Sequence, residues 1–336
     1  MNLRVLVDGR WAGDTGIGKL FREVMARAPA EISLAFIQSD MRLGSLLTPW
    51  MLAQEIRKSN ADVFYSPSFM PPFQSRIPFV FTIHDLMHLF YYTTWHRLYY
   101  QQVIARLARK AQQIITVSHF SKKQLVELLG IDERLITVIY NGVDEVYRKN
   151  EEVFQSERPY FLYVGNRRKN KNIPAMLTAF ARADIPSDFM CFLSGHGDEP
   201  LCALIAQLGI EKRVRFLGRI PETELPKLYK GAYATLFVSL MEGFGLPVIE
   251  SMASGTPVLT STAGSLPEIA DHAALCVDPH DVDAIKAGIE TLVNDADSYR
   301  EFQQKGKQRS AQFTWDRTAA NTWKVIMDNE RSNETN

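Results

Sequence analysis

The sequence has little cysteine, no apolar run long enough to cross a bilayer and no signal-peptide pattern. Its 336 residues include three cysteines, Cys191, Cys202 and Cys276, which are scattered among apolar neighbours without metal-ligand spacing. This scarcity excludes a disulfide framework and favours buried thiols in a reducing compartment. The N-terminus enters an expected strand directly, so the sequence predicts a cytoplasmic protein that does not span a membrane.

The sequence also lacks a surplus of either charge. Lysine and arginine together number 38, as do aspartate and glutamate. This balance argues against a general nucleic-acid-binding protein and leaves room only for a local basic patch. A hydrophobic share of 46% is ordinary for a globular protein. Because 336 residues are more than one hydrophobic core usually serves, two domains are expected.

Short apolar runs alternate with helical patterns on both sides of a polar, acidic stretch at residues 150–159. Such runs are typical of a parallel sheet whose two faces are covered by helices. We therefore predict an α/β protein with two doubly wound, Rossmann-like domains joined near residue 155, and ligands at the carboxyl ends of the strands. The expected strands lie within residues 3–9, 32–37, 62–66, 79–85, 113–118, 135–142, 160–165, 188–195, 214–218, 234–239, 256–261 and 274–278.

The segment EGFGLPVIE, residues 242–250, forms a glycine-rich turn between an expected strand and an expected helix. Pro247 suits the first turn of that helix. Gly243 and Gly245 allow the backbone to come close to a ligand. Amides at the positive end of a helix suit an anion or a sugar hydroxyl. The amides expected to point outward are those of Phe244, Gly245 and Leu246.

Two glutamates bracket this segment, Glu242 in the turn and Glu250 inside the helix. Glu250 lies about one turn beyond the helix start, where its carboxylate can accept hydrogen bonds from a diol. A charged group at such a place is costly without a partner. The alternative is a solvated Glu242 and a Glu250 on a polar face of the helix.

A second glycine-rich turn, GDTGIGKL at residues 13–20, nearly spells a P-loop. Leu20 replaces the serine or threonine that would hold magnesium, so the metal ligand is missing. The turn then suits a metal-free approach to a phosphate, in which Gly16 and Gly18 let amides come near the anion. A plain strand-to-helix turn is the alternative.

His84 follows an expected strand of the first domain in the motif TIHDL. A histidine at the carboxyl end of such a strand can bond a sugar hydroxyl or stabilise charge near a reacting carbon. The alternative is a core histidine whose hydrogen bonds are satisfied by the protein.

Residues 234–261 resemble the donor-site segment of retaining glycosyltransferases of family 4, which have the GT-B fold. The two glutamates with seven residues between them, Glu242 and Glu250, match the signature of that family. Eight further segments are similar to family landmarks and occur in family order. They are GIGK (16–19), TIHDL (82–86), TVSHFSKK (116–123), YNGVD (140–144), YVGNRRKNKN (163–172), SGHGD (194–198), RFLGRIPETELPKLYKGA (215–232) and FTWDRTA (313–319).

The resemblance implies roles for the two glutamates and for His84. The residue at Glu250 binds the ribose hydroxyls of a nucleotide sugar in the family. The residue at Glu242 and the amides after it hold the transferred hexose, beside which the counterpart of His84 lies. The turn at Gly16 and Gly18 approaches the leaving diphosphate of the donor.

The diphosphate between ribose and hexose needs positive charge, and YVGNRRKNKN supplies it at the carboxyl edge of the second sheet. Lys171 falls on the lysine of the family. Arg167 is the predicted second catalytic cation and Arg168 a further donor-binding residue, although Asn166 occupies the position where many relatives have arginine. A solvated basic turn is the alternative.

The resemblance further implies the reaction and the domain roles. Residues 1–155 are expected to bind the acceptor, residues 156–312 to bind the donor, and residues 313–330 to form a helix that crosses back to the first domain. The two domains of the family face each other across a cleft. Configuration is retained through attack on the same face, the leaving phosphate oxygen takes the acceptor proton, and neither a metal nor a resident cofactor is required.

The acceptor is the part of the reaction about which the sequence says least. Residues 91–113 predict a helix rich in aromatic, leucine and basic residues, and residues 68–75 form an apolar, proline-bearing loop. Both suit peripheral contact with an anionic membrane at the inner face of the plasma membrane, where a lipid-linked glycan is found. Packing of these aromatic residues in the first core is the alternative. The oligomeric state stays open.

Overall resemblance to bacterial mannosyltransferases of O-antigen and lipopolysaccharide synthesis favours GDP-mannose as donor. A UDP- or dTDP-sugar donor, which would make the protein a glucosyl-, galactosyl- or rhamnosyltransferase, is the first alternative. A nucleotide-sugar epimerase of the same architecture is a weaker one, because EGFGLPVIE is complete. A dinucleotide-dependent oxidoreductase is disfavoured, since Phe21 stands where the third glycine of its fingerprint belongs.

Overall fold

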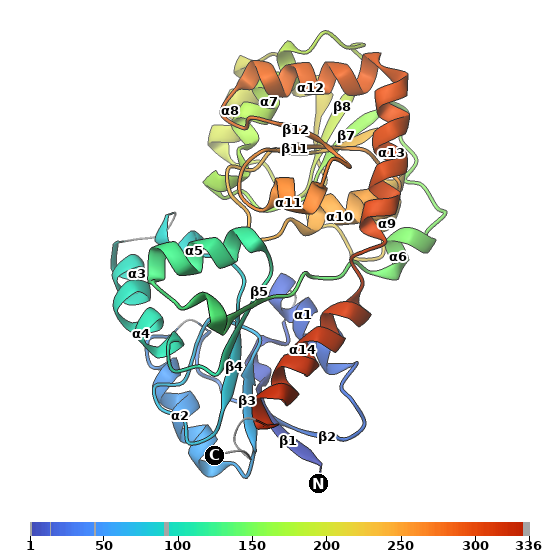
Figure 1. Cartoon of the computed structure of the whole chain (residues 1–336). Helices are drawn as coiled ribbons and strands as arrows, with labels where there is room; N and C mark the ends of the chain where they lie inside the picture. The colour runs from blue at the N-terminus through green and yellow to red at the C-terminus, as the bar shows by residue number, and fades with distance from the viewer. Residues whose placement is uncertain (1, 14, 44, 91–93, 332–336) are drawn as a thin grey trace. The chain divides into compact units, whose positions relative to one another are not determined.

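The computed structural model describes residues 2–13, 15–43, 45–90 and 94–331, which form two compact units (Figure 1). The first unit comprises Met1–Gly142 and Trp315–Asn336, and the second comprises Val143–Thr314. The second unit therefore begins at Val143 instead of near residue 155. The cause is packing: residues 143–154, which come before the expected boundary, pack on the core of the second unit.

Two aromatic residues show this packing. The Tyr147 ring, in α6 (Glu145–Lys149), lies 5.7 Å from the ring of Tyr229. The Phe154 ring lies 6.2 Å from that of Tyr160, and the Phe154 amide donates to the carbonyl of Lys227 at 3.0 Å. The polar composition of 150–159 thus marks a connection inside the second unit.

Six parallel strands form the sheet of the first unit, in the order β2-β1-β3-β4-β5-β6. Between β1 and β3 the order of the chain reverses, and in such sheets the loops on either side of this switch point carry ligand sites. The predicted strands are confirmed in position. Their bounds are β1 Leu3–Asp8, β2 Ile32–Ile37, β3 Val63–Ser66, β4 Phe79–Ile83, β5 Gln113–Thr116 and β6 Ile136–Val138.

Alternate residues of these strands enter two hydrophobic layers, as the two-residue period of a strand requires. Val5 and Val7 belong to the layer covered by α1 (Gly16–Met25) and α14 (Trp315–Arg331). Leu6 belongs to the opposite layer, which is covered by α2, by the helical segments α3, η3 and α4, and by α5. Their bounds are α2 Thr48–Lys58, α3 Thr94–Tyr99, the π-helix η3 Tyr100–Ile104, α4 Ala105–Ala108 and α5 His119–Leu129.

The C-terminal helix α14 packs in the first unit, which confirms the expected crossover. Figure 1 shows it beside α1, although the two helices lie at opposite ends of the sequence. Trp323 is only 1% exposed, and its indole nitrogen donates to the carbonyl of Val24 at 2.9 Å. Arg27 of the loop after α1 pairs with Asp316 at 2.6 Å.

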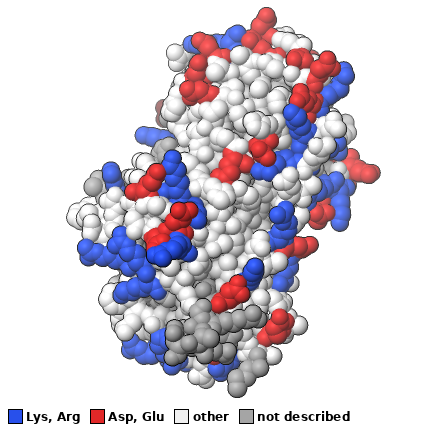
Figure 2. Space-filling view, viewed as in Figure 1, with Lys and Arg blue, Asp and Glu red and all other residues white. Residues whose placement is uncertain are grey.

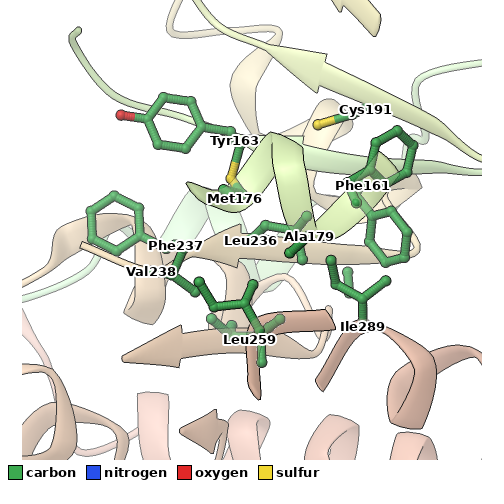
Figure 3. Packing of buried hydrophobic residues seen from close by; sticks show 14 of the residues in the cluster. Phe161, Tyr163, Met176, Ala179, Cys191, Leu236, Phe237, Val238, Leu259 and Ile289 are labelled. Carbon is green, nitrogen blue, oxygen red and sulfur yellow. The ribbon is translucent and has the colours of Figure 1, made fainter. Parts of the chain in front are cut away.

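The sheet of the second unit has the strand order β12-β11-β10-β7-β8-β9, again all parallel. Its switch point lies between β7 and β10. Side chains of neighbouring strands, among them Phe161, Leu236 and Leu259, pack with α7 and α12 in one core (Figure 3). The strands are β7 Tyr160–Tyr163, β8 Met190–Leu193, β9 Val214–Phe216, β10 Ala234–Phe237, β11 Val258–Ser261 and β12 Leu275–Val277.

Seven further helices cover the second sheet. Gly306 of α13 packs closely on α10, since an added Cβ there would lie 3.1 Å from the side chain of Met252. The helices are α7 Ile173–Arg182, α8 Glu199–Gln207, α9 Leu225–Gly231, α10 Leu246–Ala253, α11 Leu266–Ala270, α12 Val282–Asn294 and α13 Ala296–Ser310.

The three cysteines are free thiols. Cys191 is buried and Cys276 is partly buried, as predicted, whereas Cys202 is exposed. The prediction of a buried thiol is wrong for Cys202 because this residue lies on the solvent side of α8.

Candidate functional site

Two loops meet at the switch point of the second sheet, one after β7 and one after β10. Asparagines of the first loop bind the backbone of the second. The Asn170 side chain donates to the carbonyl of Met241 at 3.0 Å, and the Asn170 carbonyl accepts from the amide of Leu240 at 2.7 Å. Asn172 donates to the carbonyl of Val238 at 3.2 Å. The loops therefore form one structure.

Lys171 and Glu242 form a buried ion pair at this junction. The Lys171 Nζ lies 2.6 Å from the Glu242 Oε1, and the side chains are only 12% and 8% exposed. The Lys171 Nζ also lies 5.2 Å from the centre of the Phe237 ring. Burying two charges is costly even when they pair, so such a pair is weak evidence for stability and stronger evidence for a site. The alternative of a solvated Glu242 is wrong.

Ser265 and two glycines hold the turn that carries Glu242. The Ser265 hydroxyl lies 3.0 Å from the carbonyl oxygen of Glu242 and 3.1 Å from that of Phe244, and it bonds both. Gly245 has a φ of 101°, a conformation that L side chains rarely adopt. An added Cβ at Gly264 would lie 2.8 Å from the Glu242 amide nitrogen. The close approach of α11 to the turn thus requires glycine there.

Glu250 points into the protein from the second turn of α10. Its residue exposure is 7%, and its Oε2 accepts a hydrogen bond from the hydroxyl of Tyr229 at 3.0 Å. Burial first, and then the charge of Glu250, raise the pKa of Tyr229 well above its ordinary value, so this hydroxyl stays protonated and donates. The alternative of a Glu250 on a polar helix face is wrong.

Tyr229→Phe is expected to lower the free energy of unfolding by about 1–3 kcal/mol, because Glu250 loses a buried hydrogen-bond donor. Urea unfolding measures this change. Tyr233→Phe is the matched control, since its hydroxyl donates to the carbonyl of Leu292 at 3.0 Å, away from Glu250. We expect only Tyr229→Phe to weaken nucleotide binding as well, and equal nucleotide affinities in the two variants would contradict a positioning role for Tyr229.

Arg167 turns toward the loop after β8. Its Nη2 donates to the carbonyl of Ser194 at 2.5 Å, and its Nε donates to the carbonyl of His196 at 3.4 Å. Burial lowers the pKa of the guanidinium from its ordinary value. Its Nη1 is buried and has no hydrogen-bond partner among the described residues. Arg168, the next residue, is exposed. The structure thus joins Lys171 to Glu242, whereas the Arg167 side chain, from the same loop, binds the loop after β8.

The first glycine-rich turn is closed by its own residues. The hydroxyl of Thr15 accepts from the amide of Gly18 at 3.1 Å and caps α1, which begins at Gly16. An added Cβ at Gly18 would lie 1.7 Å from the carbonyl oxygen of Gly13, so only glycine fits. The structure gives Gly18 a local packing role, and an approach of Gly16 and Gly18 to a phosphate stays a prediction.

His84 lies directly after β4 and is partly buried. Its Nε2 is 2.8 Å from the carbonyl oxygen of Pro67, and since a carbonyl only accepts, this nitrogen carries the proton. Burial lowers the pKa of His84, which favours the neutral ring. Nδ1 of that neutral ring keeps its lone pair and can accept a hydrogen bond.

Within the described part of the chain, no three His, Cys, Asp or Glu side chains gather as metal ligands would. Sequence reasoning missed four residues of the site, namely Asn170, Asn172, Tyr229 and Ser265. Asn172 has a φ of 57°, a conformation that asparagine adopts more easily than most residues. The residue type at this position is therefore the one sequence feature that is consistent with its role. Nothing in the sequence marks Tyr229 as the partner of Glu250.

Two family models match the chain. The model described as "Glycosyltransferase Family 4" matches residues 15–146, and the model described as "Glycosyl transferases group 1" matches residues 146–309. Their shared boundary lies close to Val143, where the second unit begins.

Individual glycosyltransferases are also similar to this chain in sequence. O-antigen chain mannosyltransferase B of Escherichia coli is 31% identical over 296 residues, which are 82% of this chain and 77% of that protein. O-antigen chain mannosyltransferase RfbU of Salmonella typhimurium is 29% identical over 227 residues, which are 66% of this chain and 62% of that protein.

Solved structures support the fold. Anabaena HepE in complex with UDP and glucose has a TM-score of 0.77 at 18% identity, covering 97% of this chain and 100% of that one. WaaG, a glycosyltransferase involved in lipopolysaccharide biosynthesis, has a TM-score of 0.74 at 14% identity, covering 96% of this chain and 99% of that one. At these identities the likeness shows the fold alone.

Proposed function

The chain belongs to the glycosyltransferases of group 1 and family 4, and from this membership we propose that it transfers mannose from GDP-mannose to a hydroxyl of a growing bacterial surface glycan. It has the GT-B fold that the sequence predicted, and it is a hexosyltransferase. Two relatives named as O-antigen chain mannosyltransferases support mannose as the sugar and O-antigen as the class of product.

The buried contact between Lys171 and Glu242 is the observation that carries the proposal. The contact joins the loops after β7 and β10, at the switch point where doubly wound sheets bind ligands. We assign Lys171 to the donor diphosphate and Glu242 to hydroxyls of the hexose. Each side chain now neutralises the other, and a donor would replace that pairing with a phosphate on the lysine and hydroxyls on the glutamate.

Glu250 is assigned to the ribose hydroxyls of the donor. Its Oε2 is held by Tyr229, so the carboxylate is oriented before the nucleotide arrives. A carboxylate has about four acceptor positions, so its hydrogen bonds with Tyr229 and Tyr147 leave capacity for a diol. The start of α10 at Leu246, after Gly243, Phe244 and Gly245, supplies the positive end of a helix beside it.

The proposed reaction requires that the negative charge on the leaving diphosphate be stabilised. As the bond from sugar to phosphate loosens, Lys171 and Arg167 stabilise the negative charge that develops. Configuration is retained, the leaving phosphate oxygen accepts the proton of the acceptor hydroxyl, and His84 lies beside the transferred sugar. An inverted product would contradict this mechanism, as would activity that chelator abolishes and magnesium restores.

The acceptor belongs to the proposal too. We assign it to a lipid-linked glycan, reached from the cytoplasm by peripheral contact with the inner face of the plasma membrane. Within the described residues no helix is both long and apolar enough to cross a bilayer. Residues 91–93, at the start of the predicted aromatic and basic helix, lie outside the described residues.

A thermal-shift panel of GDP, UDP and dTDP with their sugars tests the donor. We expect selective stabilisation by GDP and GDP-mannose, and loss of that stabilisation in Glu250→Ala because the ribose loses its carboxylate partner. Glu301→Ala is the control, since that glutamate is exposed on α13 of the same unit. Stabilisation by UDP or dTDP alone would replace GDP-mannose by another donor, and stabilisation that survives in Glu250→Ala would remove Glu250 from the ribose site.

A further inference from the structure

Exposed hydrophobic side chains are concentrated in one part of the first unit. Among the described residues, nine of the twelve large hydrophobic side chains that are exposed belong to residues 36–98. Scattered apolar residues are normal on a protein surface, but a group of them marks an interaction site. The group includes two tryptophans, Trp50 at 58% exposure and Trp95 at 79%.

Trp50 and Phe73 belong to neighbouring segments of this surface. The Phe73 amide donates to the carbonyl of Pro49 at 2.8 Å, which fixes the apolar loop against the first turn of α2. Phe73 is 56% exposed, and Leu46 and Leu47 just before α2 are 66% and 62% exposed. Four apolar side chains of these two segments, Leu46, Leu47, Trp50 and Phe73, are thus exposed at the surface of the first unit.

Basic side chains border these two segments. The Lys110 Nζ lies 5.8 Å from the centre of the Phe73 ring. Lys110 and Pro72 also line a hollow of about 360 Å³ next to these segments. Residues 86–126 contain six lysines and arginines and no aspartate or glutamate, in a chain whose charges balance overall. Blue side chains gather over the part of the first unit that carries α3, α4 and α5 in Figure 2.

The sequence leaves open whether the aromatic helix expected at 91–113 packs in the first core or faces a membrane. The helical segments α3, η3 and α4 have one buried side and one exposed side. Tyr100, Ile104 and Leu107 are buried in the first unit, as the core-packing alternative required. The opposite side is exposed and carries Trp95 and Leu98 near one end, and Arg106, Arg109 and Lys110 near the other. An exposed side with aromatic and basic residues has the composition of helices that lie in a membrane interface.

We propose that the surface formed by Leu46, Leu47, Trp50, Phe73, Arg106 and Lys110 docks on an anionic lipid bilayer. The aromatic and leucine side chains enter the boundary between headgroups and acyl chains, and the two cations contact lipid phosphates. This inference deepens the proposed function, because it rests on the lipid-linked acceptor and names the surface that would bring the enzyme to it. Its residues all belong to the first unit, whereas the loops that hold Lys171 and Glu242 belong to the second.

Vesicle co-sedimentation of the full chain tests the proposal. We expect binding to phosphatidylcholine vesicles that contain about one third phosphatidylglycerol, and binding roughly tenfold weaker or more to phosphatidylcholine alone. Trp50→Ser with Phe73→Ser should weaken binding to the anionic vesicles roughly tenfold. Arg106→Gln with Lys110→Gln should weaken it by a similar factor, in a manner that added salt reproduces in the wild-type protein.

A matched charge control lies in the second unit. Arg300→Gln with Lys305→Gln removes the same two charges from exposed positions of α13 and should leave vesicle binding unchanged. Equal losses in both double variants would overturn the proposal, as would wild-type protein that binds no vesicle. Dimers in solution that Trp50→Ser with Phe73→Ser dissociates, without vesicle binding, would assign the surface to a second copy of the chain instead.

Nucleotide thermal shifts on the same proteins separate this inference from the donor assignment. We expect the Trp50→Ser, Phe73→Ser protein to keep its stabilisation by nucleotide, since neither residue belongs to the second unit. Retained nucleotide binding with unchanged vesicle binding overturns the docking surface alone. A wild-type protein that no nucleotide stabilises would overturn the donor proposal. The vesicle experiment would still test the docking surface.

Discussion

Replacing Lys171 by alanine is expected to lower kcat by roughly 10²–10³, because the leaving diphosphate loses a preorganised positive charge. Substrate affinity should fall as well, since the same cation would bind the diphosphate in the ground state. The substitution also leaves Glu242 as a buried carboxylate without its ion-pair partner. We therefore expect stability to drop by several kcal/mol, about 3–5 for a fully broken buried pair. Steady-state kinetics and urea unfolding measure the two effects.

A double-mutant cycle separates the catalytic loss from the structural one. In Lys171→Met with Glu242→Gln, both charges are gone, so much of the stability should return while activity stays low. Lys169→Ala is the control, because this lysine occupies the same 3-10 turn but is exposed. Activity that recovers together with stability in the double variant would show that Lys171 serves only to neutralise Glu242.

Replacing Trp323 by alanine is expected to destabilise the first unit by about 3–5 kcal/mol. The side chain is almost fully buried between α14 and the first sheet, and its removal would leave a large cavity. The bond from its indole nitrogen to the carbonyl of Val24 is lost too, which leaves that carbonyl without this donor. Urea unfolding gives the change in stability, and amide hydrogen exchange locates it.

Trp95→Ala is the matched control for this substitution. Trp95 is 79% exposed, so its loss should change stability by less than about 0.5 kcal/mol. We expect faster exchange in Trp323→Ala to be concentrated in residues 2–142, within the first unit. Equal acceleration in the second unit would contradict the assignment of α14 to the first core.

The sequence was sufficient to predict the strands and the residue types at the site. Apolar runs of five to eight residues between helical patterns correspond to parallel strands of three to six residues, and helices cover both faces of each sheet. Lys171 and Glu242 were each predicted separately from local motifs. Their contact was not, because they are 71 positions apart and only the order β10-β7 within the sheet brings their loops together.

Other features depended on packing that no local pattern records. Tyr229 meets Glu250 because α9 and α10 lie side by side, and the spacing of 21 residues follows no periodicity. The connection at 150–159 is polar and therefore resembles a linker, yet Phe154 packs on Tyr160 and Arg158 donates to the carbonyls of Ser187 and Asp188 in the second unit. The segment after β4 was ambiguous because one helical side is buried and the other carries exposed aromatic residues.

The chain passes between the two units twice, at Gly142–Val143 and at Thr314–Trp315, and each unit holds its two ends together. In the second unit, the Val143 amide donates to the carbonyl of Phe313 at 3.2 Å, and Arg148 donates to the same carbonyl at 3.0 Å. In the first, the hydroxyl of Thr318 donates to the carbonyl of Tyr140 at 2.7 Å.

The second unit is therefore an insertion into the first unit, with entry and exit at one place. An insertion of this kind can be exchanged as a cassette, because its ends need no new spacing when a different unit takes its place. Under the proposed roles of the two units, donor specificity and acceptor specificity can then change independently in evolution. Chimaeras made at these two crossings offer the same freedom to the protein engineer.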